Sequence, residues 1–352
     1  MPGLMTGITI KADGPRRVDL SREDFEKGSY SAMNLQKALE GLHQDGMVVL
    51  RDLVDPNHCD ALYNHMTGDR DRILQTNYKD HKVYNQGVKF IVANILQCPP
   101  FTKSELLFDD VYFNPFVIQV MNAYLGDNPK WAMTTGNNAL PGTGGMRQPV
   151  HKDTRFKHPK CPFVCISNIA LNDFTIENGA TEFWLGTHAF TDEREQVLST
   201  PDTVFQEQTA GTPTCFIKEE VVEARRLVRP PVMATMKKGD VMLRDFRCWH
   251  AGMPNSTEKD RIMIAQGWMA NWYANYTIRF KLPKSKADFF LGTARGKKME
   301  IIADLVSDQE AEDFQHRDNF RWEQTHFTEY YETAQPNYSY TTAATLPLLQ
   351  KA

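Results

Sequence analysis

Short strands separated by turns dominate the second half of this 352-residue chain, and no other feature restricts its fold as strongly. From residue 131 onward, apolar segments of strand length alternate with turn residues, chiefly Gly, Pro, Asn and Asp. We predict strands within residues 163–174, 236–246 and 260–270, and the first is apolar enough to be buried on both faces. Strands at this density are typical of a sandwich or a barrel.

The first part of the chain combines a polar start with helical patterns. Residues 1–30 are expected to form a polar N-terminal arm. The spacing of apolar residues over 35–42 predicts a helix, and residues 46–54 then read as a strand. A second helix is expected to begin at Pro56, with Asp55 as its N-cap.

Two segments depart from the strand pattern. Residues 190–235 are charged and irregular, so we expect an insertion there, either a lid over a site or a surface elaboration. Residues 276–352 are expected to form a largely helical C-terminal extension packed on the same domain. The main domain is then expected to span residues 31–275.

The composition narrows the class of partner. The formal net charge of -4 gives no electrostatic case for a nucleic acid. No stretch is long and apolar enough to span a membrane, and the N-terminus lacks the pattern of a secretory signal. We therefore expect a cytoplasmic protein whose partner is a small molecule, with no nucleic acid and no membrane partner; a homodimer is left open.

One short segment, residues 147–155, carries the strongest chemical signal. His151 and Asp153 lie two apart, so on an extended strand they share one face. His250 ends a later predicted strand, and Arg261 follows eleven residues after it. Two histidines and one carboxylate make the facial triad of non-heme Fe(II) oxygenases, and an Arg on the next strand suits a carboxylate of a cosubstrate.

Other interpretations of these residues remain. Each histidine alone is more often a hydrogen-bonded core residue, and Arg261 alone is more often a surface ion-pair partner. A zinc hydrolase with the same ligands would need a general-base carboxylate, and the sequence has no HExxH or similar motif. A non-catalytic β-barrel binding module is disfavoured because the triad and Arg261 are all present.

A resemblance to a known family rests on four stretches: residues 45–54, 147–153, 173–190 and 237–263. In these stretches the sequence resembles the phytanoyl-CoA dioxygenase family of Fe(II)/2-oxoglutarate-dependent oxygenases, in particular its fungal members of specialised metabolism. The resemblance covers roughly residues 35–275, and Leu185 stands where the family usually has Pro.

The resemblance implies a fold and a metal centre. The fold would be mainly β with flanking helices, a double-stranded β-helix or cupin-like jelly roll. His151, Asp153 and His250 would bind Fe(II) as the catalytic centre, with 2-oxoglutarate and O2 as cosubstrates.

The family pattern also implies residues that bind 2-oxoglutarate. Arg261 and Thr181 would hold its C5 carboxylate, and Gln148 would reach its C1 carboxylate. Arg279 and Arg244 are alternative basic residues for the role of Arg261.

The substrate is less well defined by the sequence. The expected reaction is the oxidation of a hydrophobic small molecule, by hydroxylation, desaturation, epoxidation or rearrangement, with release of succinate and CO2. An acyl-CoA or fatty-acid-like substrate is the alternative, because basic residues near the triad, Arg147 and Lys152 among them, would suit an acidic group; a solvated loop explains these residues equally well.

Overall fold

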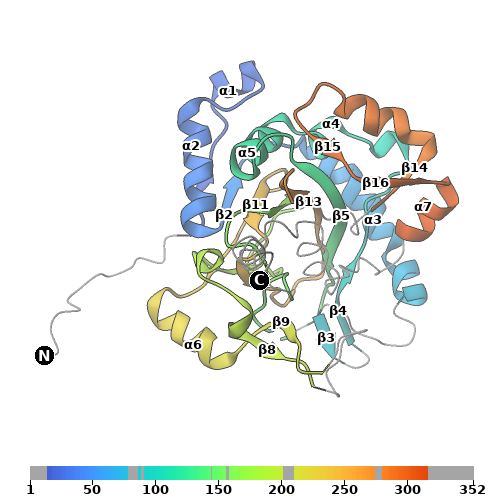
Figure 1. Cartoon of the computed structure of the whole chain (residues 1–352). Helices are drawn as coiled ribbons and strands as arrows, with labels where there is room; N and C mark the ends of the chain where they lie inside the picture. Colours follow the sequence, from blue (N-terminus) through green and yellow to red (C-terminus); the bar gives the residue numbers. More distant parts are fainter. Residues whose placement is uncertain are drawn as a thin grey trace, which may run out of the picture.

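Two β-sheets form the centre of the fold in the computed structural model (Figure 1). It describes residues 14–77, 86–88, 91–143, 145–155, 158–200, 210–273 and 280–315. The large sheet contains, in spatial order, β1 (Arg17–Val18), β2 (Met47–Leu50), β11 (Val241–Asp245), β6 (Val164–Ala170), β13 (Arg261–Met269), β5 (Lys130–Ala139), β4 (Ile91–Leu96) and β3 (Gln86–Val88), with β15 (Glu300–Ile301) paired to β5. The small sheet contains β10 (Val232–Met233), β7 (Glu182–Trp184) and β12 (Trp249–Ala251).

The chain moves back and forth between the two sheets. Strands β5, β6, β11 and β13 lie in the large sheet, while β7, β10 and β12 lie in the small one. Between β5 and β6, His151 pairs with His250 of β12, so this segment extends the small sheet. Such alternation produces a double-stranded β-helix, and the predicted jelly-roll fold is confirmed.

The strands of the large sheet separate two apolar layers. On β13, Ile262 and Ile264 belong to the core between the sheet and the helices, whereas Met263 packs on the cluster between the two sheets. On β11, Leu243 faces the helices and Met242 faces the interior of the barrel. This period of two follows from the pleat of a strand, and it means that residues facing the interior can be identified from their position.

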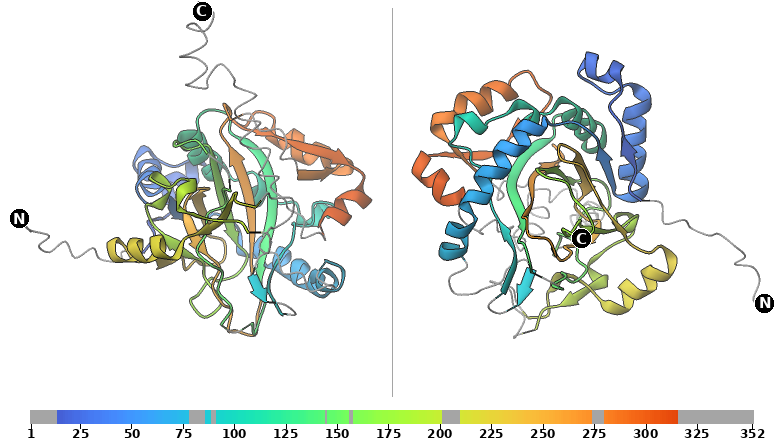
Figure 2. Two further views of the ribbon diagram at one scale, coloured as in Figure 1. Left: turned by 60° about the horizontal axis from the view of Figure 1, so that its bottom comes forward. Right: turned by 180° about the vertical axis from the view of Figure 1, so that it is seen from behind.

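Helices cover the outer face of the large sheet, as Figures 1 and 2 show. The predicted strand at 46–54 and helix from Pro56 are confirmed, and Asp55 Oδ1 accepts from the Asn57 N–H at 2.8 Å. No described helix is both long and apolar enough to cross a membrane. The α-helices are α1 (Arg22–Lys27), α2 (Ala32–Glu40), α3 (Pro56–Asn77), α4 (Asp109–Tyr112), α5 (Pro115–Leu125), α6 (Glu219–Val228) and α7 (Asp308–Gln315). The single helical turns are η1 (Gly41–Asp45), η2 (Ser104–Leu106), η3 (Thr187–Ala189), η4 (Glu193–Glu195), η5 (Lys284–Lys286) and η6 (Asp288–Gly292).

The N-terminal segment departs from the expected polar arm over residues 1–30. From residue 14 onward it is part of the fold: β1 pairs in parallel with β2, and α1 follows. Polar residues of this segment bond to residues just beyond it: buried Asp24 accepts from the Ser31 backbone N–H at 2.5 Å and from Asn34 Nδ2 at 2.6 Å. Residues 1–13 lie outside the described residues.

The described part of the C-terminal extension combines helices with strands. Residues 284–294, which include η5 and η6, are helical, and so is α7. β14 (Phe280–Pro283) and β16 (Ala303–Val306) form a parallel pair, and β15 joins the large sheet. The helical character expected of the whole extension stays a prediction. Residues 316–352 lie outside the described residues. The insertion expected at 190–235 contains β8 (Gln196–Leu198), β9 (Pro213–Ile217), α6 and β10.

We predict that Gly239→Ala destabilises the fold. Gly239 has a φ of +88°, and a Cβ there would lie 2.4 Å from the Val54 carbonyl oxygen. The Gly239 oxygen also accepts from the backbone N–H groups of Leu53 and Val54, both at 3.1 Å, so the turn cannot move away easily. The free energy of unfolding, measured by chemical denaturation, should fall by about 3 kcal/mol or more.

Gly296→Ala is the matched control for this measurement. Gly296 has a similar φ of +85°, but a Cβ there would meet nothing within 4 Å, so only the backbone cost of about 1–2 kcal/mol should appear. Equal losses in the two variants would contradict the steric argument.

Candidate active site

His151 and His250 face each other across neighbouring strands. The His151 backbone N–H donates to the His250 carbonyl at 3.0 Å, and the His250 N–H donates to the His151 carbonyl at 2.8 Å. This reciprocal pair places the two imidazole rings with their centroids 4.3 Å apart. Residues 99 positions apart in the sequence are thereby fixed side by side by backbone hydrogen bonds.

Asp153 completes a cluster of three potential metal ligands. One ligand atom each from His151, Asp153 and His250 can be chosen so that all three lie within 4.8 Å of one another. Asp153 Oδ1 is 3.7 Å from His250 Nε2. The structure thus brings together the three residues that the sequence selected, in an arrangement that suits one metal ion.

Both imidazoles are held in the tautomer that metal binding requires. His151 Nδ1 lies 3.0 Å from the Pro149 carbonyl oxygen, and His250 Nδ1 lies 3.0 Å from the Cys248 carbonyl oxygen. A carbonyl only accepts, so each Nδ1 carries the proton and each Nε2 keeps its lone pair. Burial lowers the pKa of both histidines, that of His250 to about 3, so both rings are neutral near pH 7.

The carboxylate of Asp153 has a cationic neighbour. Arg244 Nη1 donates to Asp153 Oδ2 at 2.6 Å, and Arg244 Nε donates to Asn168 Oδ1 at 3.2 Å. Burial by itself would raise the pKa of Asp153, but the charge of Arg244 and the two histidines outweigh it and hold the pKa at about 2. Asp153 is therefore ionised over the whole physiological pH range.

Arg261 is a buried cation with unpaired donors. Its side chain is 1% exposed, its guanidinium lies 4.9 Å from the centre of the Phe174 ring, and burial lowers its pKa to about 10. Within the described part of the chain, its Nε and Nη1 have no hydrogen-bond partner. A buried guanidinium with unpaired donors is suited to bind an incoming carboxylate. The residues present therefore fit a 2-oxo diacid such as 2-oxoglutarate.

The two other predicted cosubstrate residues lie on the small-sheet side. Gln148 is tied to the strand of His250: its Oε1 accepts from the Gly252 N–H at 2.7 Å, and its own N–H donates to the Gly252 carbonyl at 2.9 Å. Thr181 is buried and directly precedes β7, and its neighbour Ala180 belongs to the same apolar cluster as Phe174. The structure therefore places both residues in the walls of the barrel.

Aromatic rings and the insertion border the two histidines. The Phe183 ring stacks on His250 with centroids 5.6 Å apart, and the Phe216 ring of β9 meets His151 edge-on at 6.4 Å. Backbone hydrogen bonds from Ile217 to Val150 and from Lys152 to Cys215 hold β9 beside the His151 segment. The insertion thus forms part of the wall next to the site.

The basic residues near the triad have partners of their own. Arg147 pairs with Glu182, and Lys152 is fully buried, where its Nζ donates to Thr191 Oγ1 at 3.1 Å and to the Asp192 carbonyl at 2.8 Å. Lys152 is thus neither in a solvated loop nor in contact with the triad. The side chains of Arg147 and Lys152 are thus already engaged within the protein, which weakens the case for an acidic acyl-CoA group.

Sequence reasoning missed the contacts of Arg244 and Asn168. Arg244 entered only as a substitute for Arg261, together with Arg279, which lies outside the described residues. Asn168 was not singled out at all. A signal was present, because each is a polar residue at an interior-facing position of a buried strand. Asn168 Nδ2 is buried and has no partner among the described residues, so the barrel holds a further donor in addition to Arg261.

One family profile matches most of the chain. The profile of the phytanoyl-CoA dioxygenase family (PhyH) matches residues 42–263, well over half of the chain. A dioxygenase of Aspergillus terreus, trt7, is 22% identical over 258 residues, which cover 71% of this chain and 78% of that relative.

Solved structures with a similar backbone include two enzymes whose names state their ligands. The epimerase SnoN with Fe3+, α-ketoglutarate and nogalamycin RO aligns with a TM-score of 0.48 and 14% identity, over 68% of this chain and 84% of that chain. EctD from S. alaskensis with 2-oxoglutarate and 5-hydroxyectoine aligns with a TM-score of 0.49 and 16% identity, over 71% and 78%.

We predict that Arg261→Leu stabilises the protein when no ligand is bound. The substitution removes an unpaired buried charge, so the free energy of unfolding should rise by about 1–3 kcal/mol. Arg247→Leu is the matched control, because Arg247 is equally buried but donates to both oxygens of Asp245 at 2.8 Å. Its loss should cost about 3–5 kcal/mol. Destabilisation by both substitutions to the same extent would show that Arg261 is paired in the ligand-free protein.

Proposed function

Because the chain belongs to the phytanoyl-CoA dioxygenase family, we propose that it oxidises a hydrophobic small molecule of specialised metabolism. Family membership makes the chain a 2-oxoglutarate-dependent dioxygenase that uses Fe(II). The proposal adds the class of substrate and of reaction: hydroxylation, desaturation, epoxidation or rearrangement at a C–H bond. The existing partners of Arg147 and Lys152 support this choice over an acyl-CoA substrate.

The observation that carries the proposal is the cluster of His151, Asp153 and His250. Two neutral imidazoles and one ionised carboxylate, with ligand atoms within 4.8 Å of one another, fit Fe(II) with positions left open. When bound, iron and 2-oxoglutarate supply the oxidising chemistry, with O2 as the oxidant and with succinate and CO2 as products. The protein's part is to bind, orient and exclude water.

Each remaining residue of the proposed site has a defined task. Arg261 would hold the distal carboxylate of 2-oxoglutarate, since its guanidinium is buried and its Nε and Nη1 have no partner among the described residues. Thr181 would assist Arg261, and Gln148 would contribute near the C1 carboxylate. Phe183 and Phe216 line the histidines and would keep water from the oxidising centre.

The same proposal assigns tasks to the segments of the chain. Residues 31–275 would act as the oxygenase domain. The insertion at 190–235 would close the wall beside His151 through β9, and the described part of the 276–352 extension would brace β5 through β15.

We expect anaerobic addition of Fe(II) and 2-oxoglutarate to give the weak visible absorption of a chelated 2-oxo acid. His250→Ala should abolish this absorption, because it removes one of three ligands and leaves the other two unable to hold the metal tightly. A wild-type protein without the absorption, or a His250→Ala variant that retains it, would overturn the metal assignment.

Arg261→Ala should raise the 2-oxoglutarate concentration needed for half-maximal succinate release by about 100-fold or more. A shielded Arg–carboxylate pair is worth several kcal/mol when one partner is truncated, and about 1.4 kcal/mol corresponds to a factor of ten. Arg261→Lys should recover only part, because Lys offers a point charge without the fork of donors. If Arg261→Ala titrates like the wild type, another basic residue holds the cosubstrate.

A further inference from the structure

Arg244 contacts one oxygen of the candidate ligand carboxylate and leaves the other facing the histidines. Its Nη1 is 2.6 Å from Asp153 Oδ2, whereas Oδ1 is the atom that lies 3.7 Å from His250 Nε2. Oδ2 thus accepts from the Arg244 guanidinium, whereas Oδ1 faces the side of the two imidazoles. A carboxylate divided in this way can offer a metal only one oxygen.

Arg244 is itself held in position. Its Nε donates to Asn168 Oδ1 at 3.2 Å, and its side chain is 10% exposed. Arg244 lies on β11 and Asn168 on the neighbouring strand β6, both in the large sheet. Asp153 follows the segment that extends the small sheet. The contact from Asn168 through Arg244 to Asp153 therefore spans the barrel from one sheet to the other.

On the basis of the proposed iron site, we propose that Arg244 is a positioning residue of the metal centre. By holding Asp153 Oδ2 it fixes the rotation of the carboxylate, so that Oδ1 alone binds the metal and the other coordination positions stay open for the cosubstrate and O2. Asn168 supports this task by fixing the guanidinium. Partners of this kind typically contribute a factor of about 10–100 to metal affinity.

Electrostatics alone would give the opposite result, which makes the proposal testable. A cation beside a metal ion repels it, so removal of the Arg244 charge would strengthen metal binding if Arg244 did no more than neutralise Asp153 in the metal-free protein. Positioning predicts weaker binding. The direction of the change in affinity separates the two explanations.

The test is a Mn(II) titration of the metal-free protein, with free Mn(II) followed by electron paramagnetic resonance. Arg244→Met should raise the Kd for Mn(II) by about 10- to 100-fold. Arg244→Lys should recover part of the affinity, because its ammonium can still donate to Asp153. Asn168→Ala should cause a smaller loss in the same direction. The visible spectrum of the Co(II) form should also change in Arg244→Met, since a freed carboxylate can bind through both oxygens.

Arg229→Met is the matched control for loss of an Arg–Asp pair. Arg229 Nη1 lies 2.8 Å from Asp45 Oδ1, and neither residue belongs to the ligand cluster, so the Kd for Mn(II) should stay at the wild-type value. Circular dichroism of each variant checks that it is folded. Unchanged or tighter Mn(II) binding by folded Arg244→Met would overturn the positioning role. A wild-type protein that does not bind Mn(II) or Co(II) would instead overturn the proposed metal centre.

Discussion

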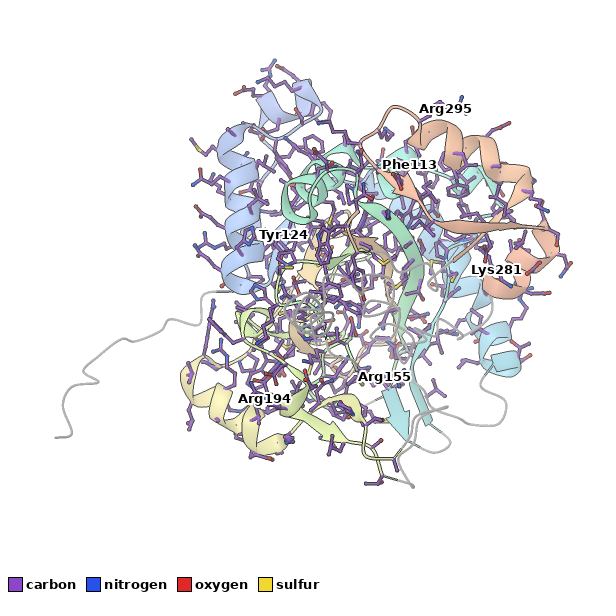
Figure 3. The ribbon with its side chains drawn as sticks, in the orientation of Figure 1. Phe113, Tyr124, Arg155, Arg194, Lys281 and Arg295 are labelled. Carbon is purple, nitrogen blue, oxygen red and sulfur yellow. The ribbon has the colours of Figure 1, made fainter. Side chains whose placement is uncertain are left out.

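The reciprocal backbone hydrogen bonds between His151 and His250 are the constraint on which the site depends. A slip of either strand by one residue would turn its imidazole to the other face of the sheet and separate the two rings. Asp153 then reaches the same space because it lies two residues beyond His151. The helices on the large sheet also hold the barrel from outside. For example, Tyr124 of α5, labelled in Figure 3, donates a hydrogen bond to buried Asp245 of β11 at 2.7 Å.

The same register connects the metal centre with the rest of the barrel. Gln148 and Gly252 repeat the pairing one step further along, through two hydrogen bonds to the Gly252 backbone. A side chain at position 252 would have to enter this contact, because a Cβ there would lie 2.5 Å from Gln148 Oε1. Glycine at this position leaves room for the hydrogen bond from its N–H to Gln148 Oε1.

The sequence predicted the features that depend on local periodicity. It did not predict contacts between residues that are far apart in the sequence. Strands β6, β11 and β13 follow from their apolar patterns, and the ligand cluster follows from the two-residue spacing of His151 and Asp153 together with a second histidine. The polar segment around Asp24 looked like an arm because its partner Asn34 belongs to the next helix. The contact of Arg244 with Asp153 could not be predicted, since the two residues lie 91 positions apart and only the closed barrel brings them together.

The charges inside the barrel imply that metal and cosubstrate favour each other's binding. Arg244 and Asp153 form an ion pair, and among the described residues Arg261 adds one buried positive charge without an ion-pair partner. A divalent cation alone would raise this buried charge by two, and a dicarboxylate alone would lower it by two, whereas both together leave it unchanged. Charge is costly in a medium of low polarity, so each ligand reduces the cost of the other. Because such coupling is reciprocal, the guanidinium of Arg261 and the three candidate metal ligands would act as one binding unit, although they belong to different segments of the barrel.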